Sequence, residues 1–303
     1  MMSFLEVKNL VKSYGKIEAV RDISFEVNEG EIYALVGPDG AGKTTIMRSI
    51  CNLIGIDRGE IFIRGDNINH KFDDKKKLLG YMPQIFSLYP DLSVEENLRF
   101  YAGIYGIVKD EFEKKAEELY EFSNLKEFRK RRAQALSGGM KQKLALSCAL
   151  MHNPKLLILD EPTTGVDPLS RRQFWEILLN LKKEGVSILV STPYMDEVAR
   201  TDKACFIFAG QKLAEGTPKE LPAIFDGQLF YLDITPSSAI VKAIEKLGNI
   251  SARRFGAGLH LTLLTNDTIG TYYAPLEQLG IKTEAIKPIK ADLEDCFIQL
   301  MEK

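Results

Sequence analysis

The stretch that decides the fold is Leu35-Val36-Gly37-Pro38-Asp39-Gly40-Ala41-Gly42-Lys43-Thr44-Thr45. It fits the phosphate-binding pattern G-x-x-x-x-G-K-[ST] and lies between an apolar strand-like run, 32–36, and a helical run, 45–53. The glycines permit a sharp turn whose backbone N–H groups converge on a phosphate at the start of the helix. In such a loop Lys43 reaches the β- and γ-phosphates, and Thr44 gives its hydroxyl to Mg²⁺. The sequence therefore predicts a nucleoside triphosphate site built on residues 37–45.

Composition narrows the class of protein. The chain has 303 residues, enough for two domains, with 45% hydrophobic and 27% charged residues. Its formal net charge is −2, without the basic excess that duplex nucleic acid usually requires. The four cysteines lie far apart without a C-x-x-C pair, which favours reduced thiols over disulfides or zinc. We identify no signal peptide and no apolar run long enough to cross a bilayer, so we expect any membrane role to depend on a partner.

A second segment combines small residues with a helix start. Leu136-Ser137-Gly138-Gly139-Met140 precedes a predicted helix that runs to about residue 152. Ser137 is either an ordinary helix N-cap or part of a second anion site that uses exposed N–H groups and the helix dipole. If residues 136–140 bind an anion, the chain has two phosphate-binding helix starts, this one and the P-loop. A single nucleotide needs only one of them.

Two carboxylates end a predicted buried strand. The run 155–159 is largely apolar, as in a strand covered on both faces of a parallel sheet, and Asp160 and Glu161 follow it. Asp160 is expected in the Mg²⁺ shell, and Glu161 is expected to orient or activate the attacking water. Gln84 follows another strand, 78–82, where a glutamine can ligate Mg²⁺ or orient a water, although most glutamines do neither. Tyr14 either stacks on a purine or is an ordinary turn residue in the segment 12–15.

With these motifs assembled, residues 1–220 resemble the ATP-binding subunit of an ABC transporter. The P-loop, the signature at 136–140, the Walker B run Leu156-Leu157-Ile158-Leu159-Asp160-Glu161-Pro162 and the D-loop Gly165-Val166-Asp167-Pro168 come in the family's order. The resemblance implies that Tyr14 stacks on adenine, that Gln84 is the Q-loop glutamine and that Asp167 is the D-loop aspartate. It also implies that two cassettes face each other, with each ATP between one P-loop and the opposite signature.

Three segments are similar to the drug-resistance type of two-component exporter: Gly37-Pro38-Asp39-Gly40, residues 80–88 with their core Tyr81-Met82-Pro83-Gln84, and Met140-Lys141-Gln142-Lys143. This similarity implies a separate integral-membrane permease and a second cassette, identical or different, as partners. It places the chain as a peripheral protein on the cytoplasmic face of the inner membrane, with no nucleic acid partner. The apolar loop 85–90, which includes Phe86 and Leu88, is expected to receive the permease's cytoplasmic coupling helix.

The resemblance also implies an α/β fold. We expect a P-loop NTPase cassette with a RecA-like parallel sheet core, an N-terminal antiparallel β subdomain and an α-helical subdomain over about 85–152. Within the last of these, Ser93-Val94-Glu95-Glu96 predicts a capping box that opens a helix. Residues 222–303 show the order β-α-β-β-α-β and predict a ferredoxin-like domain, which serves either for stability or dimerisation or as a small-molecule sensor.

One position departs from the family pattern. A histidine that contacts the γ-phosphate follows Ser-Thr at the end of the last core strand in this family, and here the residue is Pro193. Proline offers neither a side-chain donor nor a backbone N–H. We therefore expect a slow ATPase site, or alternatively a subunit that mainly binds ATP and donates its signature in a heterodimer. A non-transport cassette that binds nucleic acid or ribosomes is a further alternative, but this chain lacks the second cassette or coiled-coil insertion usual in those proteins.

Overall fold

The computed structural model describes residues 3–85, 87–263 and 267–302, without the side chains of residues 69–71. Phe86, in the expected docking loop, lies outside the described residues. The chain divides after Pro218 into two compact units. Within the described part of the chain, no helix is both long and apolar enough to span a membrane.

The first unit is organised around a largely parallel sheet with the strand order β10-β9-β3-β8-β7-β6. Its strands are β3 (Ile32–Val36), β6 (Leu79–Met82), β7 (Leu156–Asp160), β8 (Ser187–Thr192), β9 (Lys203–Phe208) and β10 (Gln211–Gly216). Only β10 runs antiparallel to its neighbour. Every residue of β3, β7 and β8 is buried, which explains their continuous apolar runs.

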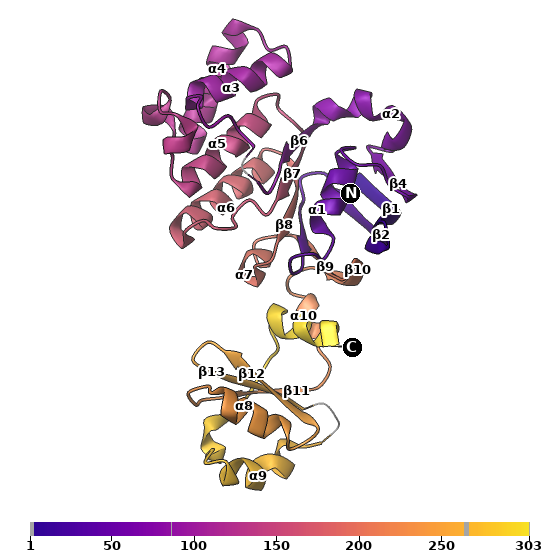
Figure 1. Ribbon diagram of the computed structural model, residues 1–303, viewed down its shortest axis with the longest axis vertical. Coiled ribbons are helices and arrows are strands. Elements are labelled where there is room, and N and C mark those ends of the chain that lie inside the picture. The colour runs from indigo at the N-terminus through magenta and orange to yellow at the C-terminus, as the bar shows by residue number, and fades with distance from the viewer. Residues whose placement is uncertain (1–2, 86, 264–266, 303) are drawn as a thin grey trace. The chain divides into compact units, whose positions relative to one another are not determined.

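Helices cover both faces of this sheet (Figure 1). They are α1 (Lys43–Ile50), α5 (Gly138–Leu150), α6 (Pro168–Lys183) and the short α7 (Met195–Val198). In Figure 1, α5 and α6 lie on one side of β6–β8 and α1 lies on the other. The predicted RecA-like core is confirmed.

The N-terminal antiparallel sheet has the order β2-β1-β4-β5 and packs with α1 into one core. Its strands are β1 (Ser3–Tyr14), β2 (Ile17–Asn28), β4 (Arg58–Ile63) and β5 (Asp66–Asn67), followed by α2 (Ile68–Lys75) and a 3₁₀ turn (Lys76–Leu78). The predicted turn at 12–15 was wrong in its extent. Strand β1 continues through Tyr14, because its pairing with β2 resumes after each register shift along the strand. The chain reverses at Gly15.

The helical subdomain contains α3 (Val94–Ile104) and α4 (Lys109–Ser123), with 3₁₀ turns at Lys126–Phe128 and Ala133–Ala135. The predicted capping box is present. Glu96 N–H donates to Ser93 Oγ at 3.2 Å, and Ser93 N–H donates to Glu96 Oε2 at 2.7 Å.

The second unit has the predicted order β-α-β-β-α-β, with an antiparallel sheet ordered β12-β13-β11-β14. Its elements are β11 (Gln228–Leu232), α8 (Ser238–Glu245), β12 (Ile250–Phe255), β13 (Gly258–Leu263), α9 (Tyr273–Gln278), β14 (Ile286–Ile289) and α10 (Leu293–Glu302), with 3₁₀ turns at Leu221–Ile224, Ile269–Tyr272 and Thr283–Ala285. The second helical element of this order is a 3₁₀ turn that continues directly into α9, and the last strand, β14, has only four residues.

Candidate nucleotide site

The loop 37–42 joins β3 to α1 and needs glycine at two positions. A Cβ on Gly37 would lie 2.1 Å from Ile207 O, and one on Gly42 would lie 2.4 Å from Ala19 O. Gly42 is also the N-cap of α1 with φ of 105°, and no side chain caps this helix start. The first N–H groups of α1 are therefore free of a side-chain cap, as an anion site at a helix start requires.

Lys43 is held over this loop by three acceptors. Its ammonium donates to Gly37 O at 2.7 Å and to Pro38 O at 3.0 Å, and it lies 2.9 Å from Glu161 Oε1. The side chain is 3% exposed. The buried Lys43 ammonium therefore lies beside the P-loop, at the place expected for the phosphates.

Asp160 ends β7 beside the P-loop helix and is fully buried. Its Oδ1 accepts from Thr44 Oγ1 at 3.1 Å and from Ser191 Oγ at 2.8 Å. Burial raises the pKa of Asp160 above its ordinary value, and the hydrogen bonds from Ser191 and Thr44 oppose that rise. Its Oδ2 is buried and accepts no hydrogen bond from the described residues.

Glu161 has a left-handed backbone, with φ of 48°, which costs a residue with a Cβ about 1–3 kcal/mol. Its N–H donates to Ser191 Oγ at 2.9 Å, which stabilises this turn. The turn directs the carboxylate toward Lys43 and Gln84, whose Nε2 donates to Glu161 Oε2 at 2.8 Å. The fold thus brings together Lys43, Gln84 and Glu161, which lie in three separate parts of the sequence.

The oxygen atoms near Thr44 fit a magnesium ion. A buried carboxylate oxygen without a partner, Asp160 Oδ2, lies on the same side chain that bonds the Thr44 hydroxyl. No group of three or more His, Cys, Asp or Glu side chains among the described residues could hold a metal. A Mg²⁺ ion that is bound together with substrate phosphates usually has only one or two carboxylate ligands from the protein, so a larger acidic cluster is not needed.

A cavity of about 400 Å³ opens over the P-loop. Its lining residues are Tyr14, Ala19, Asp39, Gly40, Ala41, Gly42, Lys43, Thr44, Thr45, Gln84 and Glu161. Tyr14 ends β1 at the edge of this cavity and is 49% exposed. The alternative that Tyr14 is a residue of the turn is wrong, because Tyr14 is the last residue of β1. Its stacking on a base stays a prediction.

The signature segment is not brought to this cavity within the chain. Ser137 caps α5, accepting from Met140 N–H at 3.3 Å, and Ser137 and Gly138 are exposed. Leu136 is buried, and a Cβ on Gly139 would lie 2.5 Å from Ser170 Oγ, so glycine allows α5 to approach α6.

Asp167, the predicted D-loop residue, is the N-cap of α6. Its Oδ1 accepts from Ser170 N–H at 2.9 Å, and hydrogen bonding to Ser170 lowers the pKa of Asp167. The role predicted for its carboxylate, like that of the signature, is not tested within a single chain.

Sequence reasoning missed two residues that organise this region. Ser191 links Asp160 to the backbone of Glu161, and its position at the end of an apolar strand was an available signal. Glu197 is 1% exposed and bonds Thr163 and Thr192, yet nothing in its local sequence marks a buried carboxylate. Pro193 follows Thr192 directly and is partly buried.

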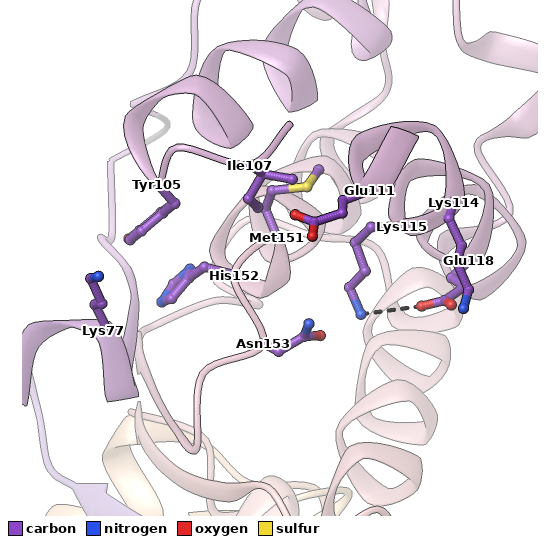
Figure 2. Close-up of a pocket in the computed structure, with 10 residues that line it drawn as sticks. All are labelled: Lys77, Tyr105, Ile107, Glu111, Lys114, Lys115, Glu118, Met151, His152 and Asn153. Carbon is purple, nitrogen blue, oxygen red and sulfur yellow. Dashed lines mark hydrogen bonds and ion pairs between the residues drawn. The ribbon is translucent and has the colours of Figure 1, made fainter. Parts of the chain in front are cut away.

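Another cavity, of about 470 Å³, lies between the end of α3, α4 and the turn after α5 (Figure 2). The Tyr105 and His152 rings are stacked there, with centroids 3.7 Å apart. Its charged lining residues have both signs, with Lys115 paired to Glu118. None of the predicted site residues lines this cavity. Its lining mixes lysines with glutamates, so it does not present the uniform positive charge that a phosphate site needs.

Comparison with known proteins identifies relatives. A sequence model described as ABC transporter matches residues 20–164. The probable multidrug ABC transporter ATP-binding protein YbhF of Escherichia coli (strain K12) is 40% identical over 219 residues, 72% of this chain and 38% of YbhF. The chain thus spans well under half of that relative. The linearmycin resistance ATP-binding protein LnrL of Bacillus subtilis (strain 168) is 37% identical over 251 residues, 82% of this chain and 80% of LnrL.

A solved structure extends the comparison to three dimensions. The dimeric post-hydrolysis structure of the ATP-binding cassette MJ0796, bound to ADP and Pi, is 26% identical with a TM-score of 0.64. The match covers 70% of this chain and 98% of the MJ0796 chain.

Proposed function

Because this chain belongs to the ABC transporter family, we propose that it is the ATP-hydrolysing subunit of an exporter whose membrane helices belong to a separate permease. The observation that carries the proposal is the meeting of Lys43, Gln84 and Glu161 over the P-loop, with contacts of 2.8–2.9 Å. The names of the relatives YbhF and LnrL, which refer to multidrug transport and linearmycin resistance, support export.

In this proposal each side chain has a stated task. The N–H groups of the P-loop and the Lys43 ammonium bind the phosphates, and the adenine stacks on Tyr14. Thr44, Asp160 and the Gln84 amide oxygen hold Mg²⁺, which when bound neutralises charge on the phosphates. Glu161 orients the attacking water and accepts its proton, which requires its carboxylate to turn away from Lys43.

The signature would act on a partner's nucleotide. The exposed start of α5, at Ser137 and Gly138, lies outside the chain's own P-loop cavity, and the related MJ0796 cassette forms a dimer. We therefore infer that Leu136, Ser137, Gly138, Gly139 and Met140 complete the site of a second cassette, with Asp167 at the same interface.

An exposed apolar surface supports docking to the permease. Ile85 is 76% and Ile104 60% exposed, and Tyr89 packs edge-on against Phe100 with ring centroids 4.5 Å apart. Burying such side chains stabilises a complex by about 25 cal/mol per Å². The surface formed by Ile85, Tyr89, Phe100 and Ile104 would receive the coupling helix and hold the subunit at the membrane.

Pro193 bears on the rate. No donor at this position can contact the γ-phosphate, and loss of one transition-state donor elsewhere costs about a hundred- to thousandfold. Hydrolysis at this chain's own P-loop would therefore be slow. In the alternative division of labour the chain serves mainly as ATP clamp and signature donor for a faster partner.

The test is Mg²⁺-dependent ATPase of the purified chain together with binding of a fluorescent ATP analogue. We expect micromolar binding and slow hydrolysis, with hydrolysis lost in Glu161→Gln and binding retained. Glu176→Gln, on the exposed side of α6, is the matched control and should match the wild type. Failure to bind ATP, or full hydrolysis by Glu161→Gln, would overturn the proposal.

A further inference from the structure

Glu197 is a buried carboxylate that does not line the nucleotide cavity. It lies in α7, is 1% exposed, and uses both oxygens as acceptors. Thr163 Oγ1 donates to Oε1 at 2.6 Å, and Thr192 Oγ1 donates to Oε2 at 2.5 Å. One side chain therefore joins two segments that are distant in the sequence.

Both of these segments border the reacting groups. Thr163 follows Glu161 by two residues, and the next residue, Thr164, donates to Glu161 Oε2 at 3.3 Å. Thr192 ends β8 immediately before Pro193, and its Oγ1 also accepts from Tyr194 N–H at 3.0 Å. Because Pro193 has no N–H, the first backbone donor after Thr192 is that of Tyr194, and the Thr192 hydroxyl accepts it.

Arg171 adds the first turn of α6 to the same cluster. Its Nε lies 3.9 Å from Glu197 Oε1, and its guanidinium carbon lies 4.3 Å from the centre of the Tyr194 ring. The positive charge compensates a carboxylate that would otherwise be costly to bury. Glu197 therefore contacts three segments, through Thr163, Thr192 and Arg171. The third segment is the first turn of α6, which begins at the D-loop.

We propose that Glu197 is a positioning residue that fixes Glu161 relative to the segment at Pro193 by bridging Thr163 and Thr192. The inference rests on the proposed ATPase function. A shift of about 1 Å in either segment would break one short hydrogen bond, and misplacements of that size can cost a reaction up to a hundredfold. If the bridge served stability alone, cutting it in a chain that still folds and binds ATP would leave kcat unchanged.

Isosteric threonine variants separate the two roles. Thr163→Val and Thr192→Val each remove one arm of the bridge without a change in size. Each should lower kcat for ATP about tenfold with KM and ATP-analogue binding within about twofold, and the double variant should be no worse than the worse single one. Glu197→Gln, which keeps the shape and one acceptor oxygen, should retain more kcat than Glu197→Ala. Glu176→Gln, on the exposed side of α6 and paired to Arg172, is the control and should match the wild type.

Hydrogen exchange gives a readout that needs no turnover. In Thr192→Val the amides of residues 161–166 should exchange faster, as should those of 190–196. Multiplicative losses of kcat in the double variant, or unchanged exchange at 161–166, would overturn the role of Glu197 while the ATPase function stands. A wild-type chain that binds no ATP would instead overturn the proposed function itself.

Discussion

Lys43 Nζ lies 2.9 Å from Glu161 Oε1, and both side chains are almost completely buried. The cation of the P-loop and this carboxylate of the Walker B run neutralise each other. Binding of a triphosphate would exchange this carboxylate for phosphate oxygens around the ammonium, and Glu161 would then be free to face a water. The buried ion pair itself is the structural basis of the first prediction.

Removal of the cation should leave a buried charge behind. Lys43→Met should lower the free energy of unfolding by about 3–5 kcal/mol, because a buried carboxylate loses its ionic partner. The double variant Lys43→Met/Glu161→Gln should recover most of that loss, whereas neither variant should hydrolyse ATP. Urea unfolding measures the first quantity. Equal stabilities for Lys43→Met and the wild type would contradict this account of the pair.

Restoring the histidine should speed hydrolysis. Pro193→His supplies a donor beside the site, and we expect kcat to rise at least about tenfold. Pro193→Ala removes the proline ring and restores the backbone N–H, but adds no side-chain donor, and should change kcat little. The comparison separates the effect of the histidine side chain from the effect of removing proline. A wild-type rate in Pro193→His, measured by steady-state phosphate release, would mean that the missing donor does not limit this site.

Tyr14 should contribute base stacking. Tyr14→Ala should weaken ATP binding about tenfold, since stacking on an aromatic ring contributes about 1–3 kcal/mol per base, and Tyr14→Phe should bind normally. Inorganic triphosphate, which has no base, should bind the wild type and Tyr14→Ala equally in calorimetry. Equal losses for ATP and triphosphate would assign Tyr14 to the loop structure instead.

Charges on the exposed apolar surface should detach the subunit from membranes that contain its permease. Ile85→Glu and Ile104→Glu should lower the membrane-bound fraction while ATP binding is unchanged, and Ile224→Glu in the second unit is the control. Leu88, expected to lie on the docking face, is only 6% exposed, so a charge there would destabilise the fold as well. Wild-type retention of the Ile85 and Ile104 variants would argue against this surface.

The capping box should make stability depend on pH. The Ser93 backbone N–H lowers the pKa of Glu96, so the unfolded chain binds more protons than the folded one as the carboxylate titrates. The stabilisation is present above the ordinary glutamate pKa and is lost as pH falls from about 5 to about 3. Glu96→Gln should be less stable than the wild type at pH 7 and equal to it near pH 3 in urea midpoints. A difference that persists at pH 3 would show that ionisation of Glu96 is not its cause.

The features with local chemistry were predictable from the sequence alone. The P-loop is a run of neighbouring residues that fits a phosphate-binding pattern, and Asp160 and Glu161 come at the end of a strand recognisable by its apolar run. The capping box and the β-α-β-β-α-β order likewise depend on periodicity over a few residues. The family's fold was therefore predictable from spacing and motif order.

Contacts between residues that are distant in the sequence depend on the tertiary structure. The Lys43–Glu161 pair, the link through Ser191 and the bridge at Glu197 all depend on parallel strands ending at the same edge of the sheet. The extension of β1 through Tyr14 and the burial of Leu88 came from partners elsewhere in the chain, and no local pattern encodes them. Hydrogen bonds and burial between remote segments form when the core packs, so the sequence can mark single residues of these contacts but not which residues pair.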